Sequence, residues 1–143
     1  MPRFVRNAAS PLLFLMLAGC GDSLGPAPRN VAEARALWQS RHVTTYSYFG
    51  SQVSFGGSSG LVRVDVSAGE VVAVTDMTTH AEIPTATWLT VDQLLDLAET
   101  LQPMPVEFDR GLGYPKRVER CCMADDSGAV YTVSSLYLVP LTF

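Results

Sequence analysis

The stretch that decides the fold is "LVRVDVSAGEVVAVT", residues 61–75. Its first half alternates strictly between apolar and charged side chains: Val62, Arg63, Val64, Asp65 and Val66. Such alternation predicts a strand whose valines face inward and whose charged residues face outward. "SAGE" then supplies turn residues, and "VVAVT" is a second apolar run. The stretch therefore predicts an antiparallel β-hairpin.

The segments on either side of this hairpin extend the pattern. "VTTYSYFGSQVSF", residues 43–55, is rich in β-branched and aromatic residues and predicts a strand with Tyr46 and Tyr48 on one side. "FGGSSG", residues 55–60, is too rich in glycine for a regular ladder and predicts a turn or flexible loop. "MTTHAEIPTATW", residues 77–88, is polar, lacks a clear period and predicts a loop.

Two amphipathic helices are also predicted. The first begins at Asn30, with Glu33 three residues later as in a capping box, and runs to about His42. The second begins at Thr90, with Gln93 as the reciprocal capping residue, and ends before Pro103. Apolar residues recur at helical spacing in both: Val31, Ala34, Leu37 and Trp38 in the first, and Val91, Leu94, Leu95, Ala98 and Leu101 in the second.

Three further apolar runs complete the expected architecture. "VEF", "RVERCCM" and "AVYTVSSLYLV" predict strands, joined by the turns "DRGLGYP" and "ADDSG". Strands that mostly follow one another as hairpins favour an antiparallel sheet. We therefore predict a single α+β domain over residues 31–143, with about six antiparallel strands and two helices packed on one face of the sheet.

The first 19 residues have the composition of a secretory signal peptide. Arg3 and Arg6 precede an apolar run from Pro11 to Ala18. This run is shorter than the ~20 residues that a membrane-spanning helix needs. Residues 1–19 are therefore expected to act as a signal and not as a transmembrane anchor.

Cys20 lies where the apolar run ends. "LAGC", residues 17–20, looks like a bacterial lipobox, and this resemblance implies that the Cys20 thiol carries diacylglycerol and its freed amine a further acyl chain. Several acyl chains hold a protein to a membrane firmly, at about 0.8 kcal/mol per buried methylene. The alternative is an ordinary free or disulfide-bonded cysteine. Residues 20–30, with glycines and prolines and no periodicity, are expected to form a flexible tether.

Charge and the residue after Cys20 bear on location and partners. The 143-residue chain has ten basic and 14 acidic residues. Loss of the leader removes Arg3 and Arg6, so eight bases face 14 acids and the net charge becomes −6. Nucleic acid is therefore not an expected partner, because phosphate binding needs a basic surface. In a Gram-negative host, Gly21 in place of an aspartate favours the outer membrane, facing the periplasm.

The order of segments resembles a known family. "YSYFG", "VRVDVSAGEVVAV", "TVDQLLDLAE", "VEFDRGLGYPKRVE" and "YTVSSL" together are similar to a bacterial lipoprotein family catalogued only as a domain of unknown function, number 6174. The similarity covers roughly residues 34–138. Members often carry two cysteines in the first strand region, where this chain has "SQVSFGGSS" and none. The resemblance implies a fold and a cell-envelope location but no activity.

The most interesting candidate for a binding loop contains Asp109 and Tyr114. Glycines between them give the backbone a defined shape, and the two side chains offer a carboxylate and a hydroxyl to a small ligand. The alternative is an ordinary capped turn. No nucleophile elbow, phosphate loop or catalytic triad is visible, and His42 and His80 share no metal-ligand spacing. We therefore expect neither catalysis nor a metal or other cofactor.

Cys121 and Cys122 are adjacent in a chain that is expected to reach an oxidising compartment. Neighbouring Cα atoms lie ~3.8 Å apart, below the usual disulfide range of ~4.4 to 6.8 Å, so a bond between them would be strained. We expect two free thiols, with Cys122 buried and Cys121 nearer solvent. A vicinal disulfide acting as a redox or binding switch is the alternative.

The sequence thus favours a lipid-anchored, non-catalytic envelope domain that binds a protein or a small ligand on one face of its sheet. Two alternatives stay open. One is an enzyme or small-ligand-binding protein that uses the loop of Asp109 and Tyr114, and the other is a structural accessory to envelope assembly.

Overall fold

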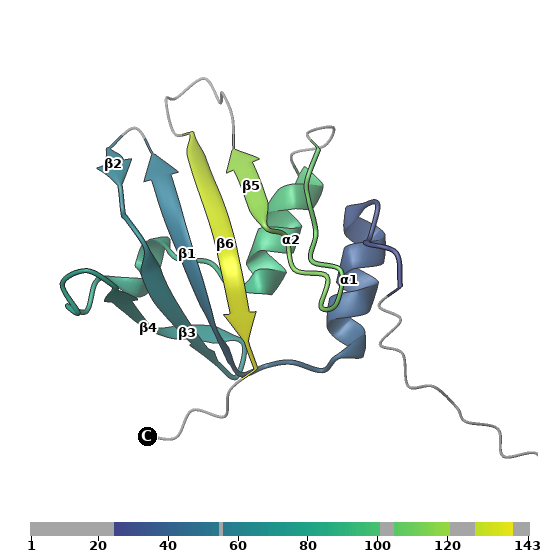
Figure 1. Ribbon diagram of the computed structural model, residues 1–143, viewed down its shortest axis with the longest axis horizontal. Helices are drawn as coiled ribbons and strands as arrows, with labels where there is room; N and C mark the ends of the chain where they lie inside the picture. The colour runs from purple at the N-terminus through teal and green to yellow at the C-terminus, as the bar shows by residue number, and fades with distance from the viewer. Residues whose placement is uncertain (1–24, 55, 101–104, 121–127, 139–143) are drawn as a thin grey trace, which may run out of the picture.

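An antiparallel sheet forms the centre of the computed structural model, which describes residues 25–54, 56–100, 105–120 and 128–138 (Figure 1). Its strands run in the order β4-β3-β1-β6-β5, and β2 pairs with β1 beside this path. The strand bounds are β1 (Tyr46–Ser54), β2 (Gly57–Ser58), β3 (Val62–Ser67), β4 (Glu70–Asp76), β5 (Arg117–Arg120) and β6 (Ala129–Tyr137). With two α-helices, this arrangement confirms the predicted α+β fold.

The β3–β4 hairpin is where the alternating stretch predicts it. Val62, Val64 and Val66 are fully buried. The connecting turn places Ala68 and Gly69 at φ +52° and +80°. Positive φ at both central residues is the geometry of the two-residue turn whose twist matches that of the flanking strands.

Asp65 departs from its expected exposure. It lies on the face opposite the valines, as alternation demands, but it is only 6% exposed. Ser47, its cross-strand neighbour on β1, donates a hydrogen bond of 2.5 Å to Oδ1, and Arg63 forms an ion pair of 3.1 Å with Oδ2. The carboxylate can be buried because both of its oxygens have partners.

Residues 55–60 were expected to form only a turn or flexible loop, and this is wrong because part of the segment is a strand. Gly57 and Ser58 form β2 and pair with the end of β1. Ser59 prolongs this pairing, because its N–H donates to the Gln52 carbonyl and its Oγ accepts from the Gln52 N–H, each at 2.9 Å. A serine hydroxyl thus replaces a backbone acceptor in the ladder.

Residues 106–108, which were predicted to form a strand, pair with no other described strand in a β-ladder. Phe108 makes only an isolated bridge, to Pro115. The Lys116 N–H donates to the Glu107 carbonyl, but the Lys116 carbonyl accepts from the Val133 N–H of β6. The chain therefore changes partner at Lys116, and β2 takes the sixth place in the sheet.

Helix α2 (Val91–Thr100) follows the short 3-10 helix η1 (Thr85–Thr87) and packs over the core side of the sheet. Its capping box is confirmed by hydrogen bonds in both directions between Thr90 and Gln93. Its buried residues are those predicted, Val91, Leu94, Leu95 and Ala98, while Leu101 lies outside the described residues.

Two buried tyrosines fix the start of α2 on β1. The Tyr46 hydroxyl accepts from the Val91 N–H, and the Tyr48 hydroxyl donates to the Leu89 carbonyl, each at 2.7 Å. The alternation that places both tyrosines on one face of β1 therefore also positions the helix.

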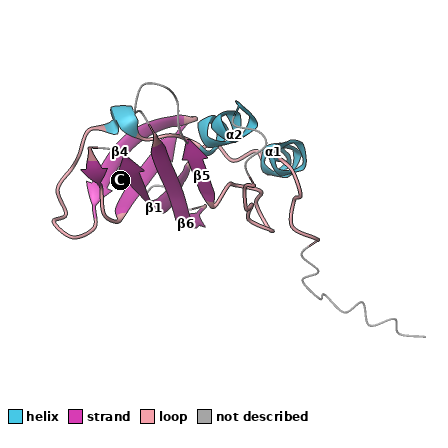
Figure 2. Cartoon of the chain, turned by 90° about the horizontal axis from the view of Figure 1, so that it is seen from above, coloured by secondary structure: helices cyan, strands magenta, loops and turns pink. Residues whose placement is uncertain are grey.

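Helix α1 (Val31–Ser40) lies beside α2, at the β5 end of the sheet (Figure 2). Asn30 caps its first turn as predicted, but the Glu33 carboxylate accepts from the Arg29 N–H and not from that of Asn30. The helix ends at Ser40, before the expected His42, which adopts φ +51°.

Contacts between side chains hold α1 to the rest of the core. Arg35 forms ion pairs with Asp96 and Glu99 of α2. The Trp38 ring packs edge-on against Tyr46, with centroids 5.2 Å apart. Across the described residues, we find no helix with both the length and the apolarity needed to cross a membrane.

Candidate functional site

Asp109 organises the loop between residues 107 and 116. Its N–H donates to the Tyr114 carbonyl at 2.8 Å, and its carbonyl accepts from the Gly113 N–H at 3.0 Å. Its Oδ1 accepts from the N–H groups of Gly111 and Leu112, at 2.9 and 2.8 Å. An aspartate that bonds to backbone two and three residues ahead is a turn-forming residue. The capped-turn alternative is therefore realised in the structure.

Gly113 fixes this loop against α1. It adopts φ +82°, and a Cβ atom added there would lie 2.5 Å from the Ala34 carbonyl oxygen. Both the backbone conformation and the close approach therefore require glycine. Arg41, at the end of α1, donates to the Gly111 carbonyl at 3.0 Å and makes a second contact between helix and loop.

Tyr114 is buried, with 6% of its surface exposed. Burial raises the pKa of its phenol, and the neighbouring Asp109 carboxylate raises that pKa further. The phenol therefore stays protonated at neutral pH. Asp109 and Tyr114 do lie together as predicted, but they stabilise a turn and a buried ring.

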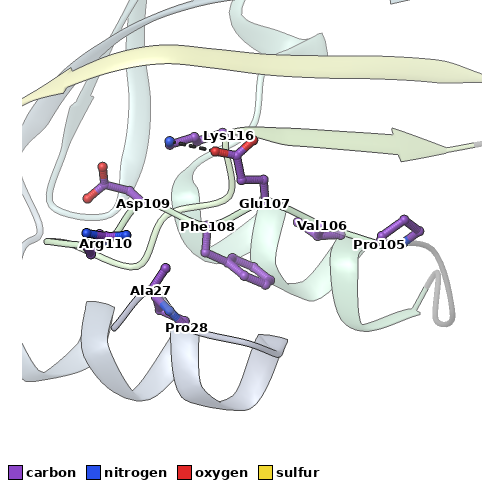
Figure 3. A pocket seen from close by; sticks show the side chains of 9 residues that line it. All are labelled: Ala27, Pro28, Pro105, Val106, Glu107, Phe108, Asp109, Arg110 and Lys116. Carbon is purple, nitrogen blue, oxygen red and sulfur yellow. Dashed lines mark hydrogen bonds and ion pairs between the residues drawn. The ribbon is translucent and has the colours of Figure 1, made fainter. Parts of the chain in front are cut away.

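A surface groove of about 510 Å³ lies beside this loop (Figure 3). One wall is formed by the segment that enters α1, and the other by the extended chain before the loop. The lining residues are Ala27, Pro28, Pro105, Val106, Glu107, Phe108, Asp109, Arg110 and Lys116. Ala27 and Pro28 belong to the predicted tether, and both are half-buried here.

The charged groups of the groove fall into two kinds. Lys116 and Glu107 form an ion pair of 2.8 Å, and this contact raises the pKa of Lys116. The Arg110 guanidinium, in contrast, makes no hydrogen bond or ion pair with any described residue, whereas the Asp109 carboxylate closes the turn through Oδ1 and also interacts with the Tyr114 phenol. Arg110 is therefore the charged residue of the groove whose side chain has no partner among the described residues.

Sequence reasoning found Asp109 but missed the rest of this site. The groove joins residues that are about 80 positions apart, and no local motif marks Arg110 or Val106 as neighbours of Pro28. The other candidates, Cys20, Cys121 and Cys122, lie outside the described residues. Within the described ranges no group of three potential ligands could hold a metal ion, and His42 and His80 are exposed.

The face of the sheet opposite the helices carries a second notable feature. Phe49 of β1 and Tyr137 of β6 pack edge-on, with ring centroids 5.7 Å apart. Tyr137 is 49% exposed, and so is Val53, which lies near the other end of the β1–β6 ladder. The aromatic pair forms a patch on a face that also carries charged residues such as Arg63 and Arg117.

The fold and the groove define a small α+β domain with an open groove of mixed charge. The chain belongs to the family of unknown function DUF6174, whose model matches residues 30–138. No curated protein and no solved structure matches the chain.

Proposed function

We propose that this protein is a non-catalytic binding module of the bacterial cell envelope, anchored to the membrane through acyl chains on Cys20. The observation that carries the binding role is the groove, which is lined by the chain segment leading away from Cys20. A ligand in the groove would contact both this segment and the folded domain.

The use of Asp109 and Tyr114 supports binding over catalysis. Asp109 Oδ1 accepts two backbone hydrogen bonds, and the buried Tyr114 phenol has a raised pKa. A general acid or base acts best with a pKa near the working pH and with access to substrate. The buried Tyr114 meets neither condition, and Asp109 already serves to close the turn, so the enzyme alternative has the weaker support.

The anchor is tested with Cys20→Ser in a Gram-negative host. The wild-type chain should be recovered in the membrane fraction with an acylated Cys20 at its amino terminus, and the variant as an uncleaved or soluble precursor. An unmodified Cys20 in the mature wild-type protein, seen by mass spectrometry, would overturn the anchor.

The binding role is tested by a photo-crosslinking amino acid placed at Pro105, which lines the groove and is exposed. The matched control position is Thr87, an exposed residue of η1 outside the groove. Irradiation of cells should give defined adducts from position 105 that are absent from position 87. Equal adduct patterns from both positions would argue against a specific site.

The sheet face opposite the helices is a second candidate, favoured by the edge-on pair of the partly buried Phe49 and the half-exposed Tyr137. It would bind a partner protein, because aromatic residues are enriched at the centres of protein interfaces. A crosslinker at Val53, half exposed on this face, should then capture a protein that position 105 does not.

A further inference from the structure

We propose that the groove binds the headgroup of a zwitterionic membrane phospholipid that carries a primary ammonium and a phosphate. This inference rests on the proposed function, since it names the ligand class of the same groove and assumes the anchor at Cys20.

The first argument is the pair of adjacent opposite charges in the groove. Asp109 and Arg110 are adjacent and both line the groove. The guanidinium is bonded to no described residue, and the Asp109 carboxylate, which accepts from Gly111 and Leu112 at Oδ1 and interacts with the Tyr114 phenol, keeps further acceptor capacity. A carboxylate oxygen accepts from an ammonium, and a guanidinium donates to phosphate oxygens, two bonds at a time where the geometry allows. One ligand that carries both groups would satisfy both side chains.

The second argument is the charge balance of the site. The groove has two acids and two bases, and the pair of Lys116 and Glu107 neutralises itself. The chain that follows the leader has a net charge of −6, from eight bases and 14 acids. A purely anionic headgroup would be repelled by this charge, whereas a neutral zwitterion is not.

The third argument is the reach of the anchor. Ala27 lines the groove and follows Cys20 by seven residues, which span at most about 25 Å when fully extended. Acyl chains on Cys20 would therefore keep the groove within that distance of the lipid headgroups. The local concentration of this ligand would be far higher than that of any soluble one.

The apolar part of the lining suits the same ligand. Pro28, Pro105 and Val106 border the groove beside its charged end. They can cover the glycerol region of a lipid while the headgroup contacts Asp109 and Arg110. A small free metabolite would leave this apolar surface in water.

The test uses the acylated chain beginning at Cys20, reconstituted into vesicles, with the photo-crosslinker at Pro105 or Thr87. Vesicles contain phosphatidylcholine alone, or phosphatidylcholine mixed with phosphatidylethanolamine or with phosphatidylglycerol. We expect lipid adducts from position 105, detected by mass spectrometry, with phosphatidylethanolamine far above the other two lipids. Position 87 should give few adducts in every mixture.

Two variants test the named contacts. Asp109→Asn keeps the Oδ1 acceptor that closes the turn but removes the charge, and Arg110→Gln removes the guanidinium. Each should lower the adduct yield roughly tenfold, the effect of losing one charge-assisted hydrogen bond. Arg29→Gln, a change of the same charge at a highly exposed side chain outside the groove, should leave the yield unchanged.

The outcomes separate this proposal from the proposed function. Failure of the acylated chain to float with vesicles would refute the anchor, and with it this inference. A chain that floats but gives no excess of adducts at position 105 refutes the headgroup site and leaves the anchor standing. Suppression of the adducts by free O-phosphoethanolamine at the same concentration as the lipid would show a soluble-ligand site and refute membrane docking.

Discussion

Replacement of Tyr46 by phenylalanine tests how the helix layer is fixed to the sheet. Tyr46 is 1% exposed, and its hydroxyl accepts the hydrogen bond of the fully buried Val91 N–H. Tyr46→Phe keeps the ring against Trp38 but leaves this N–H without a partner. An unsatisfied buried donor costs about 1–3 kcal/mol, and each kcal/mol lowers the Tm by roughly 4–8 °C in a domain of about 100 residues.

The measurement is urea and thermal unfolding followed by circular dichroism. Tyr131→Phe is the matched control, because Tyr131 is half-buried and its hydroxyl makes no hydrogen bond with the described residues. The control should stay within about 0.5 kcal/mol of wild type. A Tyr46→Phe variant as stable as the control would refute the hydroxyl's role in holding α2.

Tyr46→Phe should also change how the stability of the domain depends on pH in the alkaline range. Burial raises the pKa of Tyr46 above its ordinary value of about 10, so the folded chain keeps a proton that the unfolded chain releases. The stability that depends on this proton is fully present below pH ~10 and is lost as the pH rises further. Tyr46→Phe should therefore lose less stability than wild type between neutral pH and pH 11, although Tyr48 keeps its own contribution.

Three further substitutions test the core, the loop and the end of α1. Leu94→Ala should destabilise the domain by about 2–5 kcal/mol, because the Leu94 side chain is only 1% exposed. A loss of less than about 0.5 kcal/mol in urea unfolding would mean that this side chain is not packed in the core. Gly113→Ala should cost roughly 2–5 kcal/mol, from left-handed strain and from the clash with Ala34, whereas Gly69→Ala, with φ +80° and open space, should cost only about 1–2 kcal/mol. Equal losses of stability in the Gly113 and Gly69 variants would show that the clash with Ala34 does not contribute. His42→Gly should raise stability by up to about 1 kcal/mol in the same assay, because glycine accepts φ +51° without strain, and His42→Ala should give no gain.

The elements with strong local signals were predictable from sequence. The hairpin of β3 and β4 follows from alternation and a glycine turn, and the start of α2 follows from Thr90 and Gln93. Both signals lie within a few residues and act on their own backbone. The burial of Val64 and Leu94 followed from the same periodicities.

The elements that depend on distant partners were not predictable. "VEF" has the composition of a strand, but Lys116 bonds forward to β6, and nothing near Phe108 indicates this. The groove is a similar case, because Pro28 and Arg110 line the same groove as a result of the packing of α1 against the loop at Gly113. Asp109 was found because its turn chemistry is local, and its position in the groove is a product of tertiary structure.

The position of β6 has a consequence for how the chain folds. β6 is the last of the described strands in sequence, yet it lies between β1 and β5 and pairs with both. A nascent chain that has not reached residue 137 can form the hairpin of β3 and β4 on β1, but it has no strand to join this half to β5. The sheet is therefore completed by β1–β6 pairs such as Ser47 with Tyr137, which are far apart in sequence, and such long-range closure slows folding. The order of the strands therefore predicts that pairing of β6 with β1 is a late step of refolding.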